Sequence, residues 1–563
     1  MPALATRGSP PASPAPAPDP DGRLARVAAA LRSGRGRLAV AWGLAAFLGL
    51  AVVSAGAGIS GDEAAVIGAA HGAPPATAEP APPSGPPLAP LLARAGDATA
   101  GRIGVPHRFA LRLAAALAGA LLAALLALLG HELAGAPGAI LAPALYLLVP
   151  RHLVLGAVAT PDGLAAALGL GTVWAYRLAG RSRRRLGAAV AAGCLFGLAI
   201  AARLDAWILL PVLATHAALL RTMRRRAAAA AAAADDADTA AADPTAAALE
   251  ARLRGIPLAV AAMALVAPLV LAALWPALLV HPLRVLAGTV HSAAGLPYLG
   301  ARLAAARPPL GYPLVVTALS VPAGVLLCYA GGVAHAAWRL RRALRRGEAG
   351  VDPGDELLLL LGATAPLLAA QAGVAPLVGG VRPWLLAFPF LAVLGARALL
   401  AAARTAWPSR ARPVAASLAL LVLYPALRAS VHAWPALGGA WSALAGGAPG
   451  AASLGMQRQE PGEAARAILP ELAARARPGA RVLWLGVAPE AVAVYAADGA
   501  LRPDLGLAAD AASADLTVAV LDGGSRDAEY QAWSELRTSH PVTGVFLDEV
   551  PLVLVYARPG AWR

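Results

Sequence analysis

The fold is decided by an apolar run that ends in two acids. It reads LAVAWGLAAFLGLAVVSAGA at residues 38–57 and continues as GISGDE at residues 58–63. About 20 apolar residues suffice to span a bilayer as a helix, so Asp62 and Glu63 lie where the chain leaves the hydrocarbon. Two adjacent carboxylates beside an apolar phase need a partner or a function. They are either a solvated helix end or a catalytic base that faces a substrate in the membrane.

The composition is that of an integral membrane protein. The 563 residues are 58% hydrophobic and only 14% charged, and the formal charge is +15. Every positive residue is arginine, and arginines at the ends of spans follow the positive-inside rule, so the basic balance does not indicate nucleic acid. Cys194 and Cys328 lie inside apolar runs, which argues against a disulfide framework and a thiolate metal site.

Further apolar runs predict about eleven transmembrane helices in total. After the first, they cover residues 111–130, 138–155, 163–179, 187–202, 206–220, 256–280, 313–336, 357–377, 385–403 and 414–430. With residues 1–37 as a disordered cytoplasmic tail, the dense arginine clusters near residues 181–185, 221–226, 339–346 and 404–412 all fall on the cytoplasmic side, as the rule requires. Residues 227–252 form a cytoplasmic low-complexity linker.

The same register places the remaining loops outside. They are a first periplasmic loop at residues 59–107, a large one at 281–312, short turns at 160–162, 203–205 and 379–382, and the C-terminal region 431–563. Within that region, alternating helices (463–476, 489–497, 527–536) and strands (481–487, 516–521), closed by a hairpin of 545–548 with 552–556, predict a small α/β domain. The fold class is therefore mainly α, a polytopic membrane protein with a small soluble domain.

Several stretches share one pattern with the Asp62–Glu63 pair. They are RHLVLGAVATPDGL (151–164), GCLFGLAIAARLD (193–205), VHSAAGLPYLG (290–300), RPPLGYP (307–313), GGVRPWL (379–385) and ALGGAWSALAGGAPGA (436–451). Together they resemble one family, the polyprenyl-phosphate-sugar-dependent glycosyltransferases of family 39 and the broader GT-C class, which include protein O-mannosyltransferases and aminoarabinose transferases. The resemblance implies a GT-C-like fold over about residues 38–480. The chain departs from the family after the acidic pair, at Ala64, Val66 and Ile67.

The resemblance and the predicted topology nominate the candidate site. Asp62 would take the proton of the acceptor hydroxyl, Glu63 would orient it, and Asp162 would position a hydroxyl or an arginine, unless it only caps its helix. Arg203 and Arg382 stand at outer span ends, where they either bind the donor phosphate or snorkel to the interface.

Two aromatic side chains of the large outer loop complete the list, His291 and Tyr298, which with His281 could line the donor site. Such a histidine is more often a hydrogen-bonded loop residue. No metal is required when arginines supply the positive charge, although a divalent cation is compatible with the chemistry.

The predicted function is an inverting membrane glycosyltransferase of the bacterial inner membrane. It would move a hexosyl or pentosyl group from a polyprenyl-phosphate donor to a periplasmic glycolipid, polysaccharide or protein, with membrane lipids as its other partners. The alternatives are a transporter or flippase for lipid-linked sugars, which would carry charges in mid-span and internal repeats, and a non-catalytic scaffold. Few span interiors are charged and no repeat is evident, which favours the enzyme.

Overall fold

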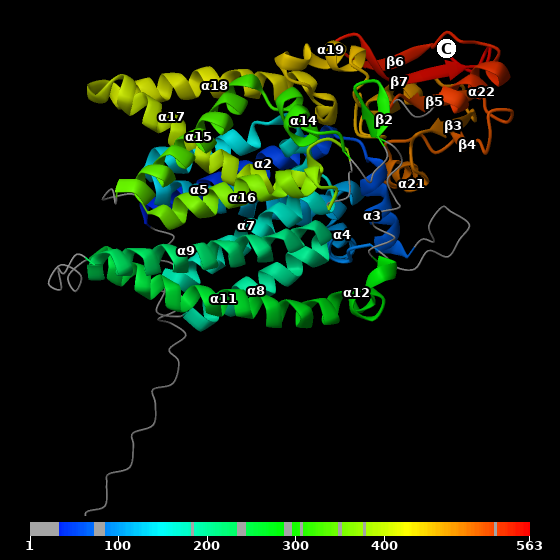
Figure 1. Ribbon diagram of the computed structural model, residues 1–563. Coiled ribbons are helices and arrows are strands. Elements are labelled where there is room, and N and C mark those ends of the chain that lie inside the picture. Colours follow the sequence, from blue (N-terminus) through cyan, green and yellow to red (C-terminus); the bar gives the residue numbers. More distant parts are fainter. Residues whose placement is uncertain are drawn as a thin grey trace, which may run out of the picture.

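The computed structural model is mainly helical, with a small sheet domain at one end of a helical bundle (Figure 1). It describes residues 33–72, 85–181, 185–233, 244–285, 296–303, 308–346, 352–374, 379–522 and 526–563. Most of the predicted tail and part of the low-complexity linker lie outside these ranges, as does His291. The first helix, α2, begins at Gly34, earlier than predicted, because the Ser33 side chain caps it by accepting from the Gly36 N–H.

Each predicted apolar run overlaps at least one helix of the structure. The bundle consists of α2 (Gly34–Gly56), α5 (His107–Leu147), α6 (Pro150–Ala157), α7 (Pro161–Arg181), α8 (Arg185–Ala202), α9 (Leu209–Ala233), α11 (Pro244–Leu274), α14 (Tyr312–Ser320), α15 (Ala323–Arg346), α16 (Pro353–Gln371), α17 (Phe388–Ala406) and α18 (Ala411–Ala433). Shorter elements connect them: α3 (Gly61–His71), α4 (Leu88–Ala100), α12 (Pro276–Val280), and the hairpin of β1 (Leu296–Tyr298) with β2 (Ala301–Leu303).

Seven helices of the described residues are long and apolar enough to cross a membrane. An eighth span results if α6 and α7, which meet at 97°, are counted together. The predicted number, about eleven, is larger for three reasons. Helix α5, counted once, contains the run 111–130 and the first part of the run 138–155. The run 313–336 is divided between α14 and α15, and the apolar part of α11, Leu258–Leu274, is short.

Helix α5 turns back on itself, which separates the two runs it contains. Gly135 has φ 72° and ψ −166°, a conformation that only glycine adopts readily. Beyond it, Ala139 packs near Ala127, although a straight helix would hold these residues about 18 Å apart. A Cβ on Gly130 would stand 2.3 Å from the Gly138 carbonyl oxygen, so the two arms touch through their backbones.

Ion pairs join the helix ends that lie opposite the sheet domain. Arg181, at the end of α7, contacts Glu132, which precedes the α5 turn, and Asp355 in the first turn of α16, the latter at 3.0 Å. Three chain segments that were predicted to share one membrane side thus meet in space. Which side of the membrane this end faces stays a prediction.

The C-terminal domain is a five-stranded mixed sheet with helices α20 (Leu469–Arg475), α21 (Pro489–Ala497) and α22 (Arg526–Leu536). Its strands are β3 (Arg481–Leu485), β4 (Gly506–Leu507), β5 (Leu516–Val520), β6 (Thr543–Leu547) and β7 (Val550–Ala557), in the order β4-β3-β5-β7-β6. The β3 strand runs parallel to β4 and β5, whereas β7 is antiparallel to β5 and β6. This sheet is the predicted α/β unit, including its closing hairpin.

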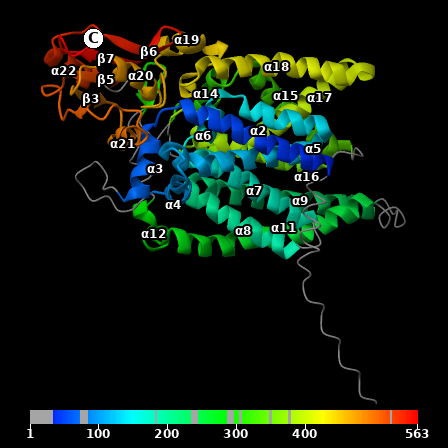
Figure 2. The same cartoon turned by 180° about the vertical axis from the view of Figure 1, so that it is seen from behind.

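The C-terminal domain forms hydrogen bonds with the segment that follows α2. The Gly58 N–H donates to the Glu463 carbonyl at 2.9 Å, Gly61 N–H to the Pro461 carbonyl at 2.9 Å, and Ile59 N–H to the Tyr495 hydroxyl oxygen at 2.7 Å. Helix α21 lies against α3, and both sit at the same end of the bundle in the view from behind (Figure 2). The start of α3 is therefore positioned by the far end of the chain.

Candidate active site

The acidic pair lies in the first turn of α3, and its two carboxylates point in different directions. The Ser60 hydroxyl accepts from the Glu63 N–H at 3.3 Å and caps the helix. Because consecutive helical residues point about 100° apart, the two side chains diverge. The Asp62 side chain is 54% exposed, whereas that of Glu63 is 0% exposed.

Glu63 is held in a buried ion pair with Arg112. The guanidinium donates to both carboxylate oxygens at 2.6 Å, and the Ala159 N–H donates to Oε1 at 2.8 Å. Arg112 also donates to the Ser54, Ala57 and Gly58 carbonyls, and so ties the end of α2 to α5. With its oxygens so occupied, Glu63 faces the protein interior and links α3 to α5.

Asp62 instead opens a chain of alternating charges that unites four of the predicted site residues. It contacts Nη1 of Arg382, whose Nε and Nη2 donate to Asp162 at 3.1 and 2.9 Å. Asp162 also contacts Arg203, which donates to both oxygens of Asp205 at 2.9 and 2.6 Å. Asp162 is fully buried, so its two arginines compensate its charge.

This arrangement occupies both predicted phosphate ligands. Each guanidinium nitrogen of Arg203 and of Arg382 contacts a carboxylate. An arginine so paired has little uncompensated charge for a phosphate unless a carboxylate moves away. Among the contacting carboxylates, the exposed Asp62 is the one that has room to do so.

Two further charged residues lie beside the chain, and the sequence analysis missed both as site residues. Glu460 approaches Arg382 Nη1 at 3.8 Å, and burial raises its pKa. Arg151, in the first turn of α6, is buried and stacks on the Trp441 ring at 4.3 Å from its centroid. Within the described part of the chain, its Nη2 is buried and has no hydrogen-bond partner.

A small recess adjoins Arg151. Its walls include Tyr298, Tyr312, Trp441 and Met456, so an apolar and aromatic surface surrounds one buried cation. Tyr298 lines this recess, in T-shaped contact with Tyr312 at 4.9 Å between ring centroids. His281 ends α12 at an exposed position, and His291 lies outside the described residues.

The sequence contained a feature that could have identified Arg151 and Arg112, but none that identified Glu460. Arg151 stands at the predicted outer end of a span, as do Arg203 and Arg382, so the same reasoning applies to it. Arg112 is a charge inside a predicted apolar run, which by itself indicates a buried partner. Glu460 lies in an irregular segment where no pattern distinguishes it.

The helical bundle with its small C-terminal sheet domain has a GT-C-like fold. ArnT from Cupriavidus metallidurans bound to undecaprenyl phosphate is similar in structure, with a TM-score of 0.50 at 16% identity, covering 93% of this chain and 98% of that one. Residues 84–234, from α4 to α9, match the family model of dolichyl-phosphate-mannose-protein mannosyltransferases. The resemblance drawn from the sequence is thereby confirmed.

Other comparisons are more distant. An oligosaccharyltransferase from Archaeoglobus fulgidus matches at a TM-score of 0.41 and 17% identity over 69% of this chain, which spans 55% of the length of that protein. No curated protein sequence matches the chain.

Proposed function

We propose that this protein is an inverting glycosyltransferase that moves one sugar from a polyprenyl-phosphate carrier to an acceptor hydroxyl. The proposed setting is the periplasmic face of a bacterial inner membrane, and the acceptor is a glycolipid, a polysaccharide or a protein. The observation that carries the proposal is the contrast between Asp62, an exposed carboxylate, and its neighbours Glu63 and Asp162, which are buried and held by arginines.

In the proposed reaction the acceptor oxygen attacks the anomeric carbon from the face opposite the phosphate. The new carbon–oxygen bond forms as the bond between that carbon and the phosphate oxygen breaks, so the configuration inverts. The acceptor proton passes to Asp62, and the polyprenyl phosphate leaves with the electron pair of the broken bond. A positioned base of this kind contributes typically 10²–10⁴-fold to the rate.

The leaving phosphate needs positive charge where it develops. Arg151 is the best-supported source, because its buried Nη2 lacks a hydrogen-bond partner among the described residues and an aromatic recess lies beside it. Arg382 is proposed to join it through Nη1 once Asp62 turns toward the acceptor, and Arg203 would hold Asp162 in place. Arginine suits this role because its planar fork matches phosphate oxygens.

The test is transfer from a defined polyprenyl-phosphate sugar by the purified protein in lipid. Asp62→Asn keeps the size but removes the basicity, so turnover should fall about 10²–10⁴-fold while binding of the donor survives. Asp62→Glu should recover little, since the added methylene displaces the carboxylate. Asp504→Asn, which alters an exposed acid of the C-terminal domain, is the matched control. Transfer by Asp62→Asn at the parent rate would refute the assignment and direct attention to Glu460 and Asp162.

A further inference from the structure

A cluster of metal-ligating side chains lies apart from the charged site. Among the described residues, one group of three such side chains brings its ligand atoms together: His71 in the last turn of α3, Asp97 on α4, and His107 at the first position of α5. The three come from separate helices, and their ligand atoms all lie within 4.8 Å of one another.

The spacing is close to that of a metal site. His107 Nδ1 lies 2.5 Å from Asp97 Oδ1, and His71 Nε2 lies 3.5 Å from Asp97 Oδ2. Tetrahedral Zn²⁺ with bonds of about 2.0–2.1 Å separates its ligand atoms by roughly 3.3 Å. Small rotations of these side chains, which are partly exposed, would bring all three to that separation.

The hydrogen bonding of His71 adds an independent argument. Its Nδ1 lies 2.9 Å from the Ile67 carbonyl oxygen, and because a carbonyl only accepts, Nδ1 must carry a proton. In a neutral ring, Nε2 then carries a lone pair and no proton. It faces the Asp97 carboxylate, which can also only accept a hydrogen bond. A cation or a second proton between the two groups would remove their repulsion. A histidine that donates its other N–H to a backbone carbonyl is the usual arrangement of a metal ligand.

We infer that His71, Asp97 and His107 bind a divalent transition metal, with Zn²⁺ the ion that fits best. Two imidazoles and one carboxylate suit Zn²⁺, whereas Mg²⁺ and Ca²⁺ favour sites made of oxygen ligands. The His71 side chain is 43% exposed, which leaves room for water as a fourth ligand. This site is independent of the proposed glycosyl transfer.

The metal would hold α3, α4 and the start of α5 together. Asp62 lies nine positions before His71 on α3, about 14 Å along the helix axis, so the ion would not touch the reacting groups. It would instead join the end of the helix that carries Asp62 to α4 and to the start of α5. A doubly protonated His71 paired with Asp97 is the arrangement that competes with a bound metal.

The experiment measures metal binding by the full-length untagged protein in detergent. After treatment with a chelator, Zn²⁺ is titrated against a competing indicator, and Co²⁺ is used in parallel for its visible absorption. We expect one tight equivalent. His71→Ala and His107→Ala should each weaken it at least 10–100-fold, the loss that follows even from removing an outer-shell partner.

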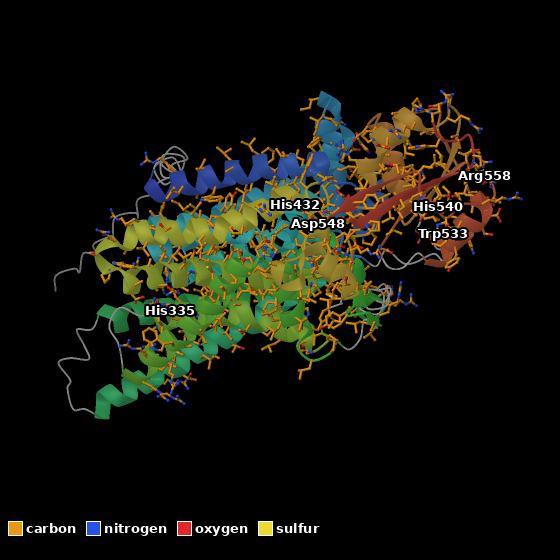
Figure 3. All side chains as sticks on the ribbon, turned by 90° about the horizontal axis from the view of Figure 1, so that it is seen from above. His335, His432, Trp533, His540, Asp548 and Arg558 are labelled. Atoms are coloured by element: carbon orange, nitrogen blue, oxygen red, sulfur yellow. The ribbon has the colours of Figure 1, made fainter. Side chains whose placement is uncertain are left out.

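The control is a histidine with a similar carboxylate contact elsewhere. His432 Nε2 lies 2.7 Å from Asp548 Oδ1, where α18 meets the C-terminal domain (Figure 3), so His432→Ala should leave the tight equivalent unchanged. Equal Zn²⁺ affinity in the three alanine variants would overturn the inference, as would a parent protein without a tight equivalent.

A second measurement uses the parent chain and so does not depend on variants that fold. Bound Zn²⁺ should protect His71 and His107 from modification by diethyl pyrocarbonate, read by peptide mass analysis, while His432 stays reactive. Unchanged modification of His71 and His107 would mean that protons, not a metal, hold the cluster together.

Discussion

The buried pair of Glu63 and Arg112 makes a quantitative prediction. Glu63→Gln preserves shape and keeps an oxygen for the Ala159 N–H, but it leaves the Arg112 charge without its counterion. Removing one partner of a buried ion pair costs about 3–5 kcal/mol. We expect the free energy of unfolding to fall by that amount. The same change of Glu490, a carboxylate that is not fully buried, should alter it by less than about 0.5 kcal/mol.

The assay is reversible unfolding in mixed micelles, completed as a double-mutant cycle. Arg112→Met removes the orphaned charge, so the variant with both changes should lose less than the sum of the two single losses, by about 0.5–3 kcal/mol. Turnover per folded molecule should fall less in Glu63→Gln than in Asp62→Asn, because Glu63 does not reach the acceptor. Strictly additive losses, or a loss no larger than that of Glu490→Gln, would refute the structural role of the pair.

Two further predictions concern the donor and pH. Arg151→Gln should weaken binding of undecaprenyl phosphate about tenfold or more, measured by competition in detergent, whereas the control Arg458→Gln should leave it unchanged. Equal affinities of the two variants for undecaprenyl phosphate would point to Arg382 as the phosphate ligand instead. Burial raises the pKa of Glu463 from its usual 4.5 to about 7, so in that window the folded state holds a proton that the unfolded state has lost. The free energy of unfolding should therefore drop by about 3 kcal/mol as the pH rises from 4.5 to 7, and Glu463→Gln should flatten this slope; an unchanged slope would contradict it.

Span positions and the α/β domain could be predicted from the sequence because periodicity and apolar runs express local structure. The match extends to the bounds of α21, predicted at 489–497 and observed there. The two-residue strand β4 was missed because so short a strand has no detectable alternation. The breaks at Gly135 and between α6 and α7 fall between predicted runs, whereas the division of the run 313–336 between α14 and α15 was not predicted.

For the site residues, the most informative sequence feature was an arginine at the predicted outer end of a span, where the positive-inside rule does not place one. It selected Arg203 and Arg382, whereas Asp162 was selected by the family resemblance, and the fold brings the three residues together. The sequence did not show that Asp62 and Glu63 would have separate partners, which follows because neighbouring residues on a helix face different directions. Pairings such as Glu63 with Arg112 are set by tertiary contacts that no local pattern records.

The hydrogen bonds between residues 58–61 and the segment around Glu463 have a consequence for biogenesis. The two segments lie about 400 residues apart in the chain, a stretch that takes roughly 20–80 s to synthesise at 5–20 residues per second. Until then α3 lacks the contacts that orient it, and the nascent protein already has most of its helices but no assembled site. A chain interrupted before the C-terminal domain would thus contain the helices of the bundle but lack the partners that hold Gly58, Ile59 and Gly61.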